Sequence, residues 1–209
     1  MTARAEILDT IRRALGRSEK TPVQPLPEVR LRKPPTDRAG LVEQFREKLE
    51  KLAGKVIVVP LPEDVLPAIA GILDGKSFVT SNAPFLKTCG IERSGISNRE
   101  ELRAACAVAD AGISSVDYAL AETGSFVMLS SPSEARLVSL LPPLHIAVIP
   151  KSKILANLDE LLTLIPKPAE QTSSMVLITG PSRTADIEQI LIRGVHGPGE
   201  VCAVIVEGS

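Results

Sequence analysis

The stretch HIAVIPKSKILANLDELLTL, residues 145–164, decides the class of fold. Its first six residues form an apolar run of strand length that is rich in β-branched side chains. Apolar residues between Ile154 and Leu162 then recur at helical spacing, which predicts an amphipathic helix from Ser152 to Leu164 with Ser152 as its cap. A buried strand followed by a helix is the repeating unit of α/β proteins, in which helices cover a mainly parallel sheet.

The same alternation runs along the rest of the chain. Strands are predicted at KVIVVP (55–60), SFVT (77–80), within CAVADAGI (106–113), and at SFVMLSS (125–131), SSMVLITG (173–180) and EVCAVIVE (200–207). Helices are predicted at 37–53, 63–73, 98–106 with Asn98 as N-cap, and 184–192. The predicted fold is therefore a layered α/β sandwich with a mainly parallel sheet.

The N-terminal part differs in composition from the rest. Ala5 to Leu15 show helical spacing that stops at Gly16, and residues 17–36 carry five prolines, which cannot join a helix interior or a sheet ladder. We predict an N-terminal helix with an extended linker over 1–35 and one domain over 36–209. Since a short isolated helix is marginally stable in water, it is expected to dock on the same chain, on a second copy of the chain or on a partner. Docking on a second copy would make the protein a homo-oligomer.

Composition excludes several classes of function. The 209 residues carry a net charge of -1 and only 2% aromatic residues, which argues against binding nucleic acid. Cys89, Cys106 and Cys202 are too far apart in sequence for a paired-cysteine metal or cluster motif. Lone thiols suit the reducing cytosol, no secretory signal is visible, and no apolar stretch reaches the ~20 residues of a membrane span. We expect a cytoplasmic protein without a membrane span.

The stretch LITGPSRTADIE, 177–188, leaves two interpretations open. Thr184, Asp186 and Glu188 fit a capped helix start after a strand. Arg183 does not, because a cation is disfavoured at a helix N-terminus, and a loop with free amides, hydroxyls and an arginine can hold a phosphate or carboxylate. The chain has neither G-x-x-x-x-G-K-[ST] nor G-x-G-x-x-G, so neither standard nucleotide loop is present.

Other polar residues are individually ambiguous. Glu122, in AETGS, could be a base or a nucleophile, or simply an exposed turn residue. His196 lies in a glycine- and proline-rich turn, where functional residues are common, whereas His145 opens a strand and fits a structural role. Arg136 could point into the crevice at the carboxyl ends of the strands, where α/β folds bind ligands, or form a surface ion pair. No G-x-S-x-G elbow supports a hydrolase triad.

Four of these motifs, in order and with similar spacing, resemble the lactate utilization protein C family, whose members contain a LUD domain. They are AETGS, RLVSLLPPLHI, GPSRTADIE and GVHGP, and the resemblance covers residues 37–207. It implies a fold similar to that of CoA transferases and ribose-5-phosphate isomerase. It also implies a part in bacterial oxidation of L-lactate to pyruvate, with iron–sulfur clusters in partner subunits and no cofactor in this chain.

The resemblance and the local chemistry together give a predicted site for a small anion. Glu122 and His196 are predicted to be catalytic, Glu122 by analogy with the nucleophilic glutamate of CoA transferases. The residues predicted to bind the ligand are Thr123, Gly124, Arg136, Ser182, Arg183 and Thr184. No metal site is predicted, and we hypothesise that Glu122, Arg183 and His196 line one pocket.

Three functions compete at this point. In the first, the chain is a component of a lactate-oxidising assembly and contributes a binding pocket or a scaffold. In the second, it is an independent CoA-transferase-like enzyme that acts on a small carboxylate or phosphorylated ligand. In the third, it is an interaction subunit without a pocket. The first is favoured by the resemblance, and the concentration of polar motifs at predicted strand ends speaks against the third.

Overall fold

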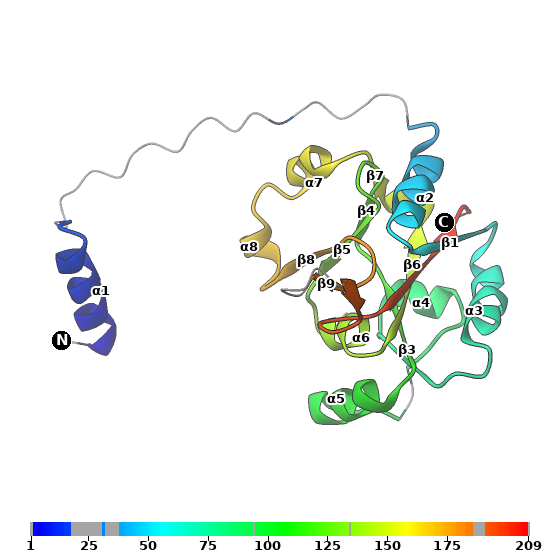
Figure 1. Ribbon diagram of the computed structural model, residues 1–209, viewed down its shortest axis with the longest axis horizontal. Helices are drawn as coiled ribbons and strands as arrows, with labels where there is room; N and C mark the ends of the chain where they lie inside the picture. Colours follow the sequence, from blue (N-terminus) through cyan, green and yellow to red (C-terminus); the bar gives the residue numbers. More distant parts are fainter. Residues whose placement is uncertain are drawn as a thin grey trace. The chain divides into compact units, whose positions relative to one another are not determined.

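A computed structural model of the chain describes residues 2–17, 31, 38–93, 95–133, 135–185 and 191–208. It divides into two compact units, Met1–Arg30 and Leu31–Ser209. The described part of the first unit is the helix α1 (Ala3–Ala14), and the remaining elements belong to the second unit (Figure 1). The apolar residues Ile7, Leu8 and Ile11 of α1 are exposed.

A five-stranded parallel sheet forms the centre of the second unit. Its strands, in spatial order, are β1 (Lys55–Val59), β11 (Glu200–Val206), β6 (Leu144–Pro150), β3 (Ala111–Ser115) and β2 (Phe78–Thr80). Every neighbouring pair in this sheet is parallel, and all seven residues of β6 are buried. The prediction of a mainly parallel sheet built from near-continuous Val and Ile runs is confirmed.

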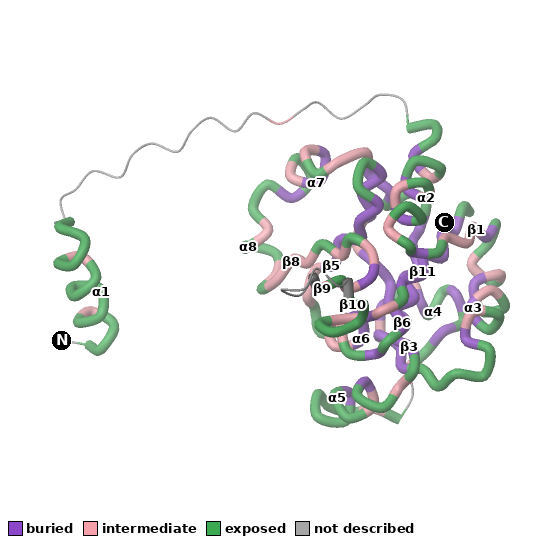
Figure 2. The backbone as a smooth tube through the Cα atoms, in the orientation of Figure 1, coloured by how far each residue is buried: buried purple, intermediate pink, exposed green. Residues whose placement is uncertain are grey.

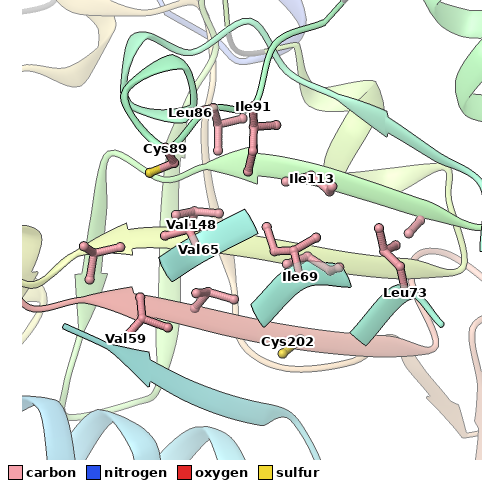
Figure 3. Packing of buried hydrophobic residues seen from close by; sticks show 14 of the residues in the cluster. Val59, Val65, Ile69, Leu73, Leu86, Cys89, Ile91, Ile113, Val148 and Cys202 are labelled. Atoms are coloured by element: carbon pink, nitrogen blue, oxygen red, sulfur yellow. The ribbon is translucent and has the colours of Figure 1, made fainter. Parts of the chain in front are cut away.

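One face of this sheet is covered by the helices that follow β1 and β2. The turn η1 (Pro62–Asp64) leads into α3 (Val65–Leu73), and α4 (Pro84–Thr88) follows β2. Figure 3 shows Val65, Ile69 and Leu73 of α3 lying over Val148 and Cys202 of the sheet. Farther along, α5 (Arg99–Val108) packs with α6 (Arg136–Leu140) beside β2.

The other face packs against α2 (Leu41–Lys51) and a second, four-stranded sheet. The order of that sheet is β7 (Ile154–Leu155), β4 (Tyr118–Leu120), β5 (Ser125–Leu129) and β8 (Met175–Ile178). The rings of Phe45 on α2 and Phe126 on β5 lie 5.8 Å apart in the cluster between the layers. Leu161 of α7 (Leu158–Leu164) packs on the outer face, and α8 (Pro168–Gln171) follows. Figure 2 shows the buried residues concentrated in the central strands β3, β6 and β11.

The prediction of one helix from Ser152 to Leu164 was wrong in its first half. Lys151–Lys153 form a single 3-10 turn, η2, and Ile154 and Leu155 pair with β4 as the short strand β7. The helix begins only at Leu158, where the Asn157 side chain accepts a hydrogen bond from Glu160 N at 3.0 Å. An apolar pair cannot by itself distinguish a helical turn from two residues of a buried strand, and pairing with β4 decides here.

The predicted helix at 184–192 was also wrong in its described parts. Arg183–Ala185 form β9 and Leu191–Arg193 form β10, and the two strands pair antiparallel with Thr184 opposite Ile192. The predicted cap residues Asp186 and Glu188 lie outside the described residues. The cap at Asn98 is confirmed, since its side chain accepts from Glu101 N at 2.9 Å. Among the helices described, none combines the length and the apolar character needed to cross a membrane.

Candidate functional site

Three of the four motifs singled out in the sequence lie together. We call residues 122–125, 179–184 and 194–198 the turn cluster. Ser125 Oγ lies 2.7 Å from Thr123 Oγ1 and 2.8 Å from Thr179 Oγ1, which joins the first two segments. Ser182 N donates to Pro198 O at 2.8 Å, and the backbone N–H of His196 lies 3.4 Å from Ser182 Oγ. All four motifs were predicted to meet at one edge of the sheet, and these contacts join three of them, whereas Arg136 of the fourth motif lines a separate cavity.

The edge is not the one expected from the general rule for α/β folds. Pro198 comes just before β11, and the segment that contacts Gly180 comes just before β1, so the turn cluster lies at the amino ends of the parallel strands. In open α/β sheets ligands bind outside the carboxyl ends of the strands. Two of the three turns follow strands of the second sheet, since residues 122–124 come after β4 and residues 179–182 come after β8, whereas residues 194–198 come before β11.

Gly124 is required by helix packing. Its φ is +66°, and a Cβ at this position would lie 2.6 Å from Leu49 N and 3.0 Å from Leu49 Cα. No real side chain tolerates such distances to backbone atoms, so only glycine lets the turn meet α2. Gly124 was predicted to bind the ligand, and the close approach to it is made here by the last turn of α2.

Arg183 also serves α2. Its guanidinium donates to the carbonyl oxygen of Leu52, the C-cap residue of the helix. The last carbonyls of a helix have no partner within the helix, and the negative end of the dipole favours a cation there. The C-terminus of α2 therefore explains the presence of Arg183, and no helix start in its own segment is needed.

The two residues predicted to be catalytic lie on the surface of the turn cluster. Glu122 is exposed, and its backbone N–H donates to Ala156 O at 2.9 Å. His196 is exposed in the turn before β11. Together with Arg183, they line none of the three cavities described below. Their catalytic roles and the hypothesis of one shared pocket stay predictions.

His145 has the structural environment expected of it. It is completely buried on β6, with Nε2 2.8 Å from Ser114 Oγ and its ring edge-on to Phe126 at 5.9 Å. Burial lowers the pKa of His145 to about 4, because an apolar interior disfavours the charged ring. The ring is therefore neutral near pH 7.

Arg136, the remaining predicted ligand residue, lies in a different place. It lines a cavity of about 770 Å³, here called the Arg cavity, together with Arg93 and Arg99. The cavity lies between the N-terminus of α5, the N-terminus of α6 and the segment after β5, and its polar lining is completed by Ser97, Asn98, Ser130, Ser131 and Ser173. No Asp or Glu among the described residues contributes to its lining.

Two polar atoms of residues that line the Arg cavity lack partners. Arg93 Nη1 and Ser130 Oγ are buried and have no hydrogen bond. The ion pairs among the described residues involve none of the three arginines. Both atoms belong to residues that line the cavity, and a buried donor without a partner costs about 1–3 kcal/mol, so that cost would be recovered if these side chains turned to meet a bound anion.

A smaller cavity of about 130 Å³ adjoins the Arg cavity, since Ser131 lines both. Ser115, Val116 and Asp117 line it from the carboxyl end of β3, which is the edge at which α/β folds bind ligands. Asp117 Oδ2 accepts from Leu129 N at 2.6 Å, and burial raises the pKa of this carboxyl group. A third cavity, of about 70 Å³, lies at the amino ends near Lys55 and Glu200.

Sequence reasoning missed Arg93, Arg99 and Ser130. Together with Arg136 they fall in two stretches of the chain, 93–102 and 130–140, and nothing in the sequence indicates that these two stretches lie side by side. One local signal existed at Arg99, the first residue of α5, because a cation at a helix N-terminus is unfavourable unless an anion compensates it. The same argument was applied to Arg183, whose segment forms no helix in its described parts.

Comparisons with known proteins agree with the fold and the motifs. The family model described as LUD domain matches residues 42–206. A protein named lactate utilization protein C from Bacillus subtilis is 33% identical over 175 residues, which cover 82% of this chain and 70% of that protein. A protein of the same name from Halalkalibacterium halodurans is 45% identical over 103 residues, 47% of this chain and 45% of that protein. The chain thus spans less than half of the length of that second relative.

The fold has a solved counterpart. A DUF162 family protein from Deinococcus radiodurans superposes with a TM-score of 0.63 over 82% of this chain and 99% of that chain, at 22% sequence identity. At this identity the likeness concerns the fold alone.

Proposed function

Because this chain belongs to the LUD domain family, we propose that it is a cytoplasmic component of a bacterial L-lactate utilization system and that the Arg cavity is its small-anion site. The observation that carries the first part is the similarity to the Bacillus subtilis lactate utilization protein C over 82% of this chain. The second part is supported by three arginines around one cavity and by the absence of any acidic residue among its described lining residues.

We further propose that the system oxidises L-lactate to pyruvate and that the chain acts with iron–sulfur partner subunits. This oxidation removes two electrons and two protons from the C2 carbon and its hydroxyl group, and iron–sulfur clusters in the partner subunits would accept the electrons. In this proposal the partner subunits carry the electrons, and the residues of this chain bind and orient an anion. Arginine suits that task because its guanidinium stays charged and presents fixed pairs of N–H donors to carboxylate or phosphate oxygens.

The test is growth on L-lactate as sole carbon source after deletion of the gene, in a strain without a second gene of the family. The deletion strain should fail on L-lactate and grow normally on pyruvate, because pyruvate enters after the proposed step. Normal growth on L-lactate would refute the proposed function.

Complementation separates a binding pocket from a scaffold. The chain with Arg136→Gln should fail to restore growth on L-lactate, whereas the chain with Arg103→Gln should restore it, since Arg103 is exposed on α5 and does not line the Arg cavity. If both variants restore growth at equal protein levels, the chain acts in the system without an anion site at Arg136. Co-purification of iron–sulfur proteins with the tagged chain tests the proposed partners separately.

A further inference from the structure

We infer that the Arg cavity binds an organic phosphate, with the phosphate group at its arginines and the organic body along its leucines. The inference rests on the proposed anion site and names the class of its ligand. It concerns a molecule other than lactate, since lactate matches neither the charge nor the size of the cavity.

Charge is the first reason. Arg93, Arg99 and Arg136 line the cavity, and a guanidinium keeps its charge at all physiological pH values. A single carboxylate carries one negative charge and two oxygens, which one arginine can satisfy as a bidentate partner. A phosphate monoester carries nearly two negative charges and three terminal oxygens at pH 7, so it can engage several guanidinium groups and a hydroxyl at once.

The second reason is the state of the polar groups. Arg93 and Ser130 both line the cavity, and Arg93 Nη1 and Ser130 Oγ are buried without hydrogen-bond partners. Each of these two atoms therefore has hydrogen-bonding capacity that the protein does not use. The neighbouring acid, Glu101, is already engaged, because its two carboxylate oxygens accept from Ser97 N and from Asn98 Nδ2 at 2.7 Å each. The positive charge of the cavity is therefore not balanced by Glu101.

The third reason is size and apolar character. A volume of about 770 Å³ falls in the ~300–1,000 Å³ range of pockets that hold ligands of drug or cofactor size, whereas lactate is a three-carbon anion. Leu102, Leu137 and Leu140 line the cavity beside the arginines. A wall of leucines gives no affinity to a free inorganic ion and a favourable surface to the apolar part of an ester.

The inference is tested by titration calorimetry on the full chain with four probes at fixed ionic strength: inorganic phosphate, phenyl phosphate, L-lactate and pyruvate. Phenyl phosphate should bind most tightly, because it has both the phosphate and an apolar body, and inorganic phosphate should bind more tightly than either carboxylate. Arg93→Gln should weaken both phosphates by roughly tenfold or more, which corresponds to about 1.4 kcal/mol. Arg103→Gln, outside the cavity on the same helix as Arg99, should leave every affinity unchanged.

Leu140→Ala separates the two halves of the proposed site. It should weaken phenyl phosphate and leave inorganic phosphate unchanged, since Leu140 is half-buried in the lining and carries no polar group. Should Arg93→Gln fail to fold, Arg99→Gln takes its place, because Arg99 is exposed and its loss removes no buried group.

Three outcomes overturn the inference. If lactate binds as tightly as the phosphates, the cavity is an anion site but the assignment to organic phosphates is wrong. Arginine variants that fold and bind phosphate normally would place the phosphate elsewhere on the chain. Absence of binding by all four probes would remove both the ligand class and the anion site, while growth on L-lactate would still decide the proposed function by itself.

Discussion

The substitution Gly124→Ala tests whether the turn cluster is built for packing. Gly124 closes the turn between β4 and β5, with its N–H donating to Leu120 O at 2.9 Å, and it has a φ of +66°. An added Cβ would meet the backbone of Leu49 and Lys48 at 2.6–3.0 Å. The side chains of Phe45 and Leu49 are fully buried, so α2 cannot move away without opening the core.

The expected cost has two parts. A left-handed backbone costs a residue with a Cβ about 1–2 kcal/mol. Overpacking against a fixed neighbour costs about 1–3 kcal/mol more. The variant should therefore lose about 2–5 kcal/mol, which is a large part of the ~5–15 kcal/mol that stabilises an ordinary domain.

The measurement is the free energy of unfolding from urea denaturation, and Gly75→Ala is the matched control. Gly75 has a φ of +82° and nothing within 4 Å of an added Cβ, so the control contains the backbone cost without the contact. Gly124→Ala should be less stable than the control by about 1–3 kcal/mol. Equal stabilities would refute the packing argument, and the glycine would again need a ligand to explain it.

Three further predictions concern single side chains. Burial lowers the pKa of His145 to about 4 in the native state from the ordinary 6.5, so the unfolded state binds the proton more readily than the native state does. About 3 kcal/mol of the free energy of unfolding should therefore be lost as the pH falls from 6.5 to 4. His145→Gln should make the free energy of unfolding, measured by urea titration, less dependent on pH in this range. Arg183→Ala should lower the free energy of unfolding by about 0.5–1.5 kcal/mol, since the carbonyl of Leu52 loses a donor, and an unchanged midpoint would contradict this. If Glu122 is a nucleophile, Glu122→Gln should abolish growth on L-lactate without changing thermal stability, and normal growth would remove it from the predicted site.

The sequence predicted the class of fold because buried parallel strands consist almost entirely of apolar residues. HIAVIP and EVCAVIVE are such runs, and both became central strands of the parallel sheet. The second sheet was not separated from the first, because its strands are short and β7 has only two residues. Ile154 and Leu155 continue the helical spacing of Leu158 and Leu161, so only their pairing with β4 reveals them as a strand.

The site was predictable in part. The motifs identified three turns that do lie together, and Arg136 was selected without any knowledge of the cavity around it. Its companion Arg93 lies about 40 residues away, and the nearer Ser130 has an ordinary serine position after a strand, so neither carries a pattern in the sequence that joins it to Arg136. Arg183 was selected because a cation is unfavourable at the helix start predicted for its segment. In the structure its guanidinium donates to Leu52 at the C-terminus of α2, a helix from a different part of the chain.

Hydrogen-bonding capacity now separates the two groups of predicted residues. In the turn cluster, Gly124 meets α2, Ser182 contacts the turn at 196–198, and Arg183 donates to Leu52, so each of these three residues has a partner inside the protein. In the Arg cavity, Arg93 Nη1 and Ser130 Oγ are buried without one. Since a native fold leaves few buried polar groups unsatisfied, such atoms around a cavity without described acids are the better indication of where an anion binds.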